Sequence, residues 1–246
     1  MSAQHTVLLV GGTGRTGGRV LQQLLERGVN VRAIVRSAER LPADVAGKPG
    51  LTVIEADLLT LSDADLLRHA RGCDAVISCL GHTISLKGVL GAPHYLVAEA
   101  VERLCRAIRA SRPEVPVKFI LMSSVSVNRA GGLDTYRGAF DRFFMWMMRG
   151  LVPPARDNQR AADILQGIGT GDPYLQWVAV RPDTLLEEET TEYSLHEGLV
   201  STLFKPDSTN MGNVAHFMCE LATNQATWGD WAGKLPVIIN DSAVGE

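Results

Sequence analysis

Residues 6–17 read TVLLVGGTGRTG, a short apolar run that leads directly into a glycine-rich turn. From Gly12 the turn has the pattern G-x-G-x-x-G, and a helical pattern runs on from Gly14 to Arg27. A strand, a glycine turn and a helix in this order let the backbone approach a pyrophosphate and turn the helix N–H groups toward it. The stretch predicts a dinucleotide site, with a purely structural glycine turn as the alternative. Its cradle would consist of Gly11, Gly12, Thr13, Gly14, Arg15, Thr16 and Gly17.

Apolar runs and helical patterns alternate along most of the chain. Helices are expected at 14–27, 62–70 and 95–110, between strands at 6–10, 29–35, 51–55, 75–80, 117–122 and 176–180. Runs of this length suit strands that are buried on both faces. The alternation predicts an α/β fold with a doubly wound parallel sheet.

The pattern weakens after Arg181. Residues 183–210 are expected to be irregular and to lie over the mouth of a site, with Glu187–Glu189 as a solvated loop. A helix near 213–222 and a strand near 237–239 follow. We therefore expect a single domain over 1–246, with its core at about 5–182 and a small substrate-side portion at about 183–246.

Composition excludes several classes of protein. The chain has 246 residues and a net charge of −3, so nucleic acid is not an expected partner. The first residues lack a basic leader and a long apolar run, which predicts no stable membrane insertion and a cytoplasmic location. Histidines at metal-binding spacing are absent from the sequence, so no metal site is expected. The cysteines stand in apolar runs and are expected to be reduced core residues: Cys73, Cys79, Cys105 and Cys219.

Arg36 follows the second expected strand, 19 residues after Gly17. A site for NAD usually has an acidic residue near this position, whereas an arginine accommodates the 2′-phosphate of NADP. Guanidinium groups match phosphate oxygens bidentately. Arg36, together with Arg15 in the loop, predicts that NADP(H) is preferred over NAD(H). A solvated charge at a strand end is the alternative for Arg36.

Four stretches carry a resemblance to a known family: residues 10–17, 56–58, 76–81 and 180–182. In these the chain resembles an atypical short-chain dehydrogenase/reductase of the NAD(P)H-binding, NmrA-like and biliverdin/flavin-reductase-like branch, which has a Rossmann fold. The resemblance covers about 5–182 and continues loosely through 213–218. It implies that Asp57 and Leu58 lie at the adenine, that Gly81 lets the chain pass close to the cofactor, and that Pro182 shapes the nicotinamide pocket. Asp57 also has an alternative interpretation, in which it only ends a strand and caps a turn.

The resemblance also implies catalytic positions, and here the chain departs from the pattern. Short-chain reductases usually carry a Ser followed by Tyr-x-x-x-Lys. Ser123 and Tyr136 are suitably spaced, but Phe140 stands at the lysine position. In a later Lys-x-x-x-Glu arrangement, Gln159 and Asp163 would take the two places. Both lysine positions therefore lack the cation that would lower a tyrosine pKa.

The candidate catalytic residues are Ser123, Ser124 and Tyr136, with His82 as a further proton donor. Ordinary strand-end hydroxyls and a surface histidine are the alternatives. An apolar stripe from Phe140 to Met148 suits core packing, a substrate pocket, a dimer face or a membrane-facing patch.

Flavins and quinoid compounds need little acid catalysis, because solvent protonates the product. We therefore expect an NADP(H)-dependent oxidoreductase that passes hydride to a small apolar or conjugated acceptor. The alternative is a non-catalytic NADP(H)-binding sensor or assembly protein. The chain would act as a homodimer or with a regulatory protein partner.

Overall fold

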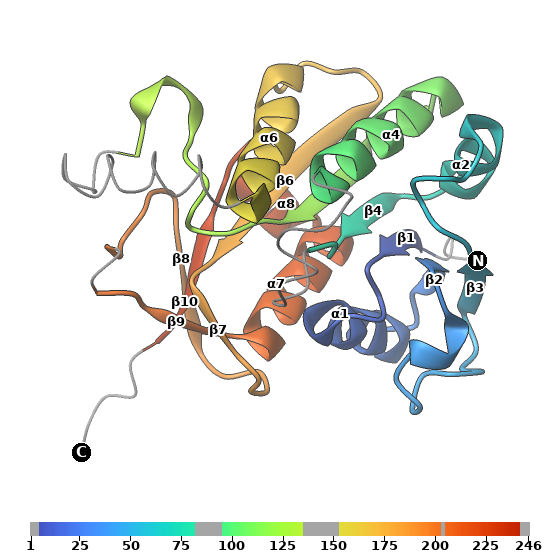
Figure 1. The fold of residues 1–246 in the computed structure, drawn as a ribbon, viewed down its shortest axis with the longest axis horizontal. Helices are drawn as coiled ribbons and strands as arrows, with labels where there is room; N and C mark the ends of the chain where they lie inside the picture. The colour runs from blue at the N-terminus through green and yellow to red at the C-terminus, as the bar shows by residue number, and fades with distance from the viewer. Residues whose placement is uncertain (1–4, 82–94, 135–152, 203–204, 242–246) are drawn as a thin grey trace.

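The computed structural model describes residues 5–81, 95–134, 153–202 and 205–241 (Figure 1). Its centre is an eight-stranded sheet in the order β3-β2-β1-β4-β5-β6-β10-β8. All neighbouring strands are parallel except β8, which runs antiparallel to β10 at the edge. The predicted doubly wound α/β fold is confirmed, with one antiparallel edge strand that was not predicted. The strands are β1 (Thr6–Val10), β2 (Asn30–Val35), β3 (Leu51–Glu55), β4 (Ala75–Ser78), β5 (Val117–Met122), β6 (Leu175–Pro182), β8 (Tyr193–His196) and β10 (Val237–Asn240).

Helices cover both faces of the sheet (Figure 1). On one face lie α2 (Asp63–Ala70), α4 (Leu96–Ser111) and α6 (Pro153–Ile168), and on the other α1 (Arg15–Glu26) and α7 (Met211–Thr223). Along β1, Leu8 and Val10 belong to one apolar core, while Val7 and Leu9 belong to the other. Because both faces of the central strands are buried, these strands appear in the sequence as mainly apolar runs. The edge strand β3 is partly exposed, so the expectation of burial on both faces was wrong for it. Two further elements are the short helix α8 (Gln225–Trp231) and the 3-10 turn η1 (Ala38–Arg40).

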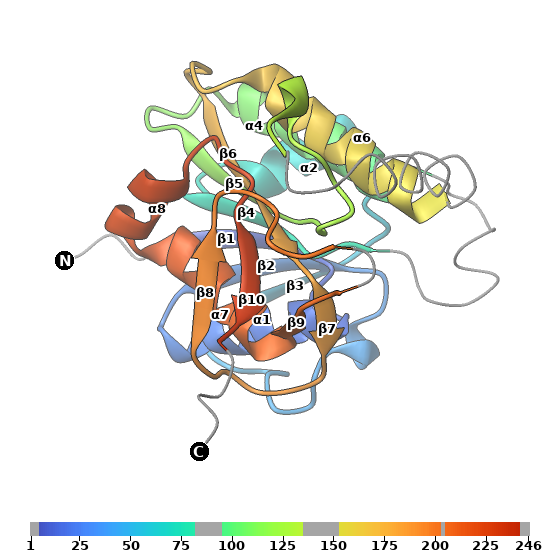
Figure 2. The ribbon, with the colours of Figure 1, turned by 90° about the vertical axis from the view of Figure 1, so that its left-hand side faces the viewer.

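The C-terminal portion is more regular than the sequence suggests. Residues 183–210, expected to be irregular, contain β7 (Thr184–Leu186), β8 and β9 (Ser208–Asn210). The strands β7 and β9 form a separate two-stranded sheet, whereas β8 extends the main sheet beside β10 (Figure 2). That prediction was wrong because these strands are short and largely polar, so they lack an apolar run.

An asparagine cluster holds this portion together. The Asn240 Oδ1 accepts hydrogen bonds from the Asn210 N–H and from the Asn213 Nδ2, both at 2.8 Å. The Asn240 Nδ2 in turn donates to the Asn210 Oδ1 at 2.7 Å. These bonds join β9, α7 and β10 by side-chain amides, which hydrophobic periodicity does not report.

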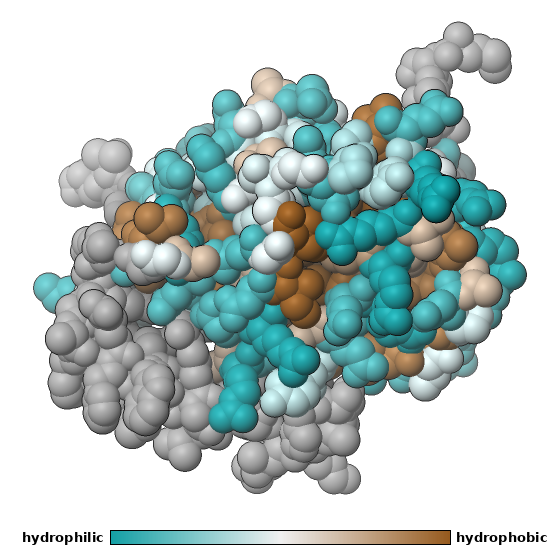
Figure 3. Space-filling view, turned by 90° about the horizontal axis from the view of Figure 1, so that it is seen from above, coloured by the Kyte–Doolittle hydropathy of each residue, from teal (hydrophilic) through white to brown (hydrophobic). Residues whose placement is uncertain are grey.

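The outer surface on the side of α2, α4 and α6 is mainly hydrophilic (Figure 3). Apolar side chains appear there in separate areas between the hydrophilic ones. Across the described ranges, no helix is both long and apolar enough to cross a bilayer. The cysteines expected in the core are buried free thiols.

Candidate functional site

The glycine turn packs tightly against the end of β4. Gly11 has φ +83°, and a Cβ on it would lie 2.6 Å from the carbonyl carbon and oxygen of Cys79. A Cβ on Gly17 would lie 2.1 Å from the Gly11 carbonyl oxygen. These two glycines are therefore required by the protein's own packing. Gly14 caps α1, and its N–H donates to the Gly11 carbonyl at 3.0 Å.

The first turn of α1 faces the carboxyl edge of the sheet with open donors. Within the described ranges, the N–H groups of Arg15, Thr16 and Gly17 donate no hydrogen bond. Such orphan N–H groups, with the partial positive charge of a helix N-terminus, favour an anion. The turn thus has the open donors that a phosphate cradle requires, and phosphate binding by its residues stays a prediction.

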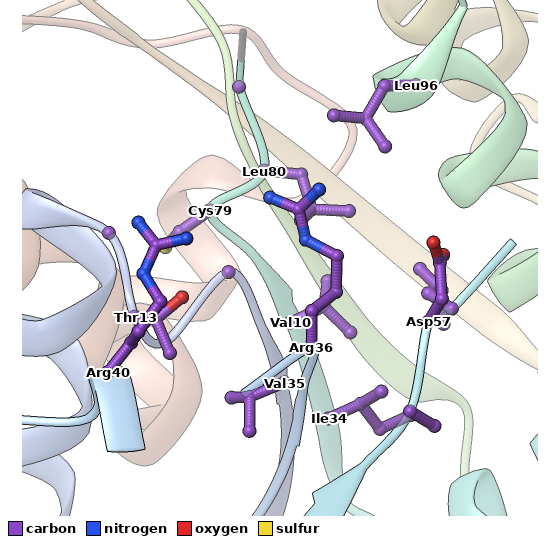
Figure 4. Close-up of a pocket in the computed structure, with 15 residues that line it drawn as sticks. Val10, Thr13, Ile34, Val35, Arg36, Arg40, Asp57, Cys79, Leu80 and Leu96 are labelled. Atoms are coloured by element: carbon purple, nitrogen blue, oxygen red, sulfur yellow. The ribbon is translucent and has the colours of Figure 1, made fainter. Parts of the chain in front are cut away.

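A cavity of about 160 Å³ opens beside this turn (Figure 4). It runs from the glycine turn past the ends of β2 and β3 to the segment after β4 and the start of α4. Seven of the predicted site residues line it: Gly11, Thr13, Gly14, Arg36, Asp57, Leu58 and Gly81. The cavity also includes a residue that the sequence analysis missed, Arg40.

Arg36 and Arg40 bring two guanidinium groups to one side of the cavity (Figure 4). Both residues are exposed, and neither has an ion-pair partner among the described residues. Arg36 directly follows β2, and Arg40 ends the 3-10 turn η1. The only sequence signal for Arg40 was its position four residues after Arg36, because a three-residue turn leaves no hydrophobic pattern. Two unpaired cations at a cavity wall attract an anionic group.

Asp57 lies across the cavity from Arg36 (Figure 4). Its Oδ1 accepts the Leu59 N–H at 2.9 Å, and its backbone carbonyl accepts the Thr60 N–H at 3.1 Å. Asp57 therefore forms the turn after β3, as its alternative role predicted, and it also lines the cavity; its contact with the adenine stays a prediction. Leu58 beside it is nearly buried and closes the same wall.

Gly81 differs from the other glycines of the site. It lines the cavity, but a Cβ on it would have no described protein atom within 4 Å. Packing of the described chain therefore does not require glycine here. A Cβ at this position would have room among the described residues that line the cavity.

Other predicted cofactor residues lie outside the cavity lining. Arg15 pairs with Glu187 at 2.8 Å, and Arg19 pairs with Glu189 at 3.4 Å. The segment expected as a solvated acidic loop thus lies against α1. Gly12, Thr16 and Gly17 stand in the turn behind the cavity, and Pro182 is buried at the end of β6. Their direct contact with a cofactor stays a prediction.

Two serines follow β5. Ser123 is 7% exposed, and within the described chain its buried Oγ has no hydrogen-bond partner. The Ser124 Oγ accepts the Ser126 N–H at 3.1 Å, so it stabilises a local turn. Of the two hydroxyls, that of Ser123 is the one without a hydrogen-bond partner among the described residues, and Ser123 does not line the cavity. Tyr136, His82 and the stripe from Phe140 to Met148 lie outside the described residues.

The second lysine position is occupied by a hydrogen-bonded amide. The Gln159 Oε1 accepts the Asn128 N–H at 2.9 Å. The Gln159 Nε2 donates to the Asn128 carbonyl at 3.2 Å and to the Asp163 Oδ1 at 2.8 Å. Gln159 and Asp163 therefore do form the predicted pair on α6. The pair holds the loop after β5 and supplies no cation.

Arg181 is fully buried at the end of β6. Its Nη1 pairs with the Asp134 Oδ2 at 2.7 Å, and Arg129 pairs with the Asp134 Oδ1 at 3.0 Å. Burial alone would raise the pKa of Asp134, but the hydrogen bonds and positive charges of the two arginines outweigh it, so the pKa is lowered. This ion cluster fixes the loop after β5 to the strand that follows it.

A buried carboxylate fixes the beginning of α4. Asp157 on α6 is fully buried and accepts the Val97 N–H at 2.8 Å and the Ala98 N–H at 2.9 Å. Negative charge is favourable at a helix N-terminus. Leu96, at the same end of α4, lines the cavity. The contact thus holds one wall of the site in place.

Comparison with known proteins agrees with this geometry. The pattern of the NAD(P)H-binding family matches residues 11–225. The chloroplastic protein TIC 62 of Oryza sativa subsp. japonica is 28% identical over 242 residues, which cover 90% of this chain and 44% of that protein. Its counterpart in Arabidopsis thaliana is 28% identical over 241 residues, covering 90% and 34%. The chain thus spans less than half the length of these relatives.

Solved structures support the fold. An oxidoreductase from Lactococcus lactis has a TM-score of 0.68 at 20% identity, covering 96% of this chain and 90% of that one. A Rossmann-fold NAD(P)-binding family protein from Shigella flexneri has a TM-score of 0.67 at 16% identity, covering 99% and 98%. At these identities the likeness concerns the fold alone. The family match covers most of the chain, so this protein belongs to the NAD(P)H-binding family and has a Rossmann fold.

Proposed function

We propose that this chain binds NADPH in preference to NADH. The observation that carries the proposal is the pair of exposed guanidiniums, Arg36 and Arg40, on one wall of the cavity that begins at the glycine turn. The 2′-phosphate is the group that distinguishes the two cofactors, and it is a strong acceptor for guanidinium donors. With NADH, the two guanidiniums would face neutral ribose hydroxyls and would lack the attraction between opposite charges that a 2′-phosphate supplies.

The remaining cavity residues fit the rest of such a cofactor. The open N–H groups at the start of α1 would hold the pyrophosphate. Asp57 and Leu58 would contact the adenine and its ribose, together with Leu96. Gly81 would leave room for the cofactor where the chain passes the carboxyl edge of the sheet.

We further propose that the chain is a reductase of a small apolar or conjugated acceptor. The bound cofactor would supply the hydride. The buried Ser123 hydroxyl has no described partner and would donate a hydrogen bond to the acceptor. Gln159 supplies no cation, which favours acceptors such as flavins or quinones that take their proton from solvent.

A non-catalytic NADPH sensor is the second candidate. It is favoured by one observation: the amide of Gln159, at the family's lysine position, is already bonded to the Asn128 backbone. In that role the chain would bind NADPH tightly and act through a regulatory protein partner.

The test combines binding and turnover. We expect Arg36→Glu and Arg40→Glu to weaken NADPH binding much more than NADH binding. Arg68→Glu, on the exposed surface of α2, is the control and should change neither. NADPH oxidation is then followed with flavin, dichlorophenolindophenol and quinones, using Ser123→Ala as the comparison variant. Equal effects of the arginine variants on both nucleotides would refute the preference. Tight binding without turnover on the full panel would favour the sensor.

A further inference from the structure

We infer that Arg103 on α4 is a positioning residue for the adenine half of the cofactor site, acting through the turn that follows β3. The inference rests on the proposed NADPH site. Arg103 does not line the cavity itself. It lies behind the turn whose residues Asp57 and Leu58 do.

The guanidinium of Arg103 bonds to this turn at three points. Its Nη1 donates to the Leu58 carbonyl at 2.7 Å. Its Nη2 donates to the Leu61 carbonyl and, at 3.1 Å, to the Asp63 Oδ1. The Arg103 side chain is only 10% exposed, so its bonds to the two carbonyls are partly shielded from water, whereas the Asp63 side chain is 65% exposed. Charged hydrogen bonds in such surroundings are stronger than neutral ones at the surface.

The same turn is bonded from within by Asp57. The Asp57 Oδ1 accepts the Leu59 N–H, and its backbone carbonyl accepts the N–H groups of Thr60 and Leu61. Asp57 therefore holds the N–H groups of the turn, while Arg103 holds its carbonyls. Loss of the Arg103 bonds would let Leu58 and Asp57 move at the cavity wall.

The position of Arg103 on α4 links two parts of the cavity wall. Leu96, at the N-terminal end of the same helix, lines the same cavity as the turn, on the side of Asp57 in Figure 4. That end is fixed by the buried Asp157. Because α4 carries both Leu96 and the anchor of the turn, Arg103 determines how far Leu58 stands from Leu96. An adenine ring bound between them would depend on that spacing.

Arginine suits this role better than lysine. A planar guanidinium donates in several fixed directions, whereas an ammonium is a single point donor on a flexible chain. The neighbouring Arg106 provides a matched contrast. It lies on the same helix, is 58% exposed, and approaches the Asp63 carboxylate at 3.5 Å without a hydrogen bond to the carbonyls of the turn.

The test measures the affinities of Arg103→Met, Arg103→Lys and Arg106→Met for NADPH, NADH and 2′,5′-ADP. Methionine keeps an apolar stem and removes the donors. We expect Arg103→Met to weaken all three ligands by a common factor of about ten, the usual worth of a charged hydrogen bond. The ratio of NADPH to NADH affinity, which Arg36 would set, should stay unchanged. Arg103→Lys should recover part of the loss, and Arg106→Met should bind like the wild type.

The outcomes distinguish a failure of this inference from a failure of the proposed NADPH site. Wild-type protein that binds neither NADPH nor 2′,5′-ADP would overturn both. Wild-type binding with unchanged affinities in Arg103→Met would overturn the positioning role alone. Where Arg103→Met is unfolded at the assay temperature, Arg103→Lys decides in its place. Arg103→Lys could be folded, melt below the wild type and still bind 2′,5′-ADP with wild-type affinity. That result would indicate that Arg103 has a structural role only, and it would overturn the inference.

Discussion

Substitution of Gly17 by alanine is expected to damage the glycine turn by a direct backbone collision. The new Cβ would lie 2.1 Å from the Gly11 carbonyl oxygen, 2.8 Å from its carbon and 3.1 Å from the Cys79 Cβ. Two of these three atoms belong to the backbone, so rotation of a side chain does not relieve the contact. Either α1 or the turn must move.

The size of the effect follows from the cost of overpacking. A backbone collision of this kind should lower the free energy of unfolding by about 3 kcal/mol, at the upper end of the usual range. For a chain of this size that corresponds to a fall of roughly 6–12 °C in melting temperature. NADPH binding should fall as well, because the displaced turn carries the open N–H groups of α1.

Gly18→Ala is the matched control on the same helix. Its Cβ would meet the ring of Pro42 at 3.1 Å and the Gly12 carbonyl oxygen at 3.6 Å, a much milder contact. The higher helix propensity of alanine offsets part of that cost, by about 1 kcal/mol. Thermal unfolding and NADPH titration of both variants give the comparison. Equal melting temperatures for Gly17→Ala and Gly18→Ala would refute the collision.

Three further outcomes are expected. Gly81→Ala should keep the wild-type melting temperature, because a Cβ there has no described protein atom within 4 Å. It should bind NADPH about tenfold more weakly, because the added methyl group would collide with a cofactor that passes this position; an unchanged titration would remove Gly81 from the site. Asp134→Asn should lower stability at pH 7 by about 3 kcal/mol, because it removes the buried ion pair between Asp134 and Arg181. In the folded state the pKa of Asp134 is lowered from its ordinary value of 3.8, so the unfolded state binds the proton more readily. The stabilisation by the Asp134 carboxylate is therefore lost as the pH falls below about 4. Denaturation at pH 7 and at acid pH should show that the difference in free energy of unfolding between the variant and the wild type becomes smaller at acid pH. Burial raises the pKa of Cys105 and of Cys219 to about 12, so both thiols should react with a thiol reagent only after unfolding, and rapid labelling of the native protein would contradict their burial.

The central fold could be predicted because its strands are buried on both faces. The apolar stretches at residues 7–10 in β1 and 119–122 in β5 are unbroken. The glycine turn directly follows β1 and opens α1, and this context gives its spacing a meaning. The strands of the C-terminal portion could not be predicted in this way. They are held by Asn210, Asn213 and Asn240, whose partners lie far apart in the sequence.

The candidate site was predictable only in part, for a related reason. Arg36 stands directly after a recognisable strand, whereas Arg40 depends on a 3-10 turn that leaves no periodic signal. The buried pairing of Arg181 with Asp134 joins residues 47 positions apart. The bonds of Gln159 to the Asn128 backbone likewise require the fold. Sequence patterns report burial and turns, but they do not report which polar groups meet.

The most direct test of the account is a paired titration of the purified wild-type protein with NADPH and NADH, followed by tryptophan fluorescence. The account predicts micromolar binding of NADPH and much weaker binding of NADH, with the difference removed in Arg36→Glu. Equal affinity for both nucleotides would contradict the role given to Arg36 and Arg40. Absence of binding to either would show that the turn of Gly11 to Gly17 is only structural in this chain.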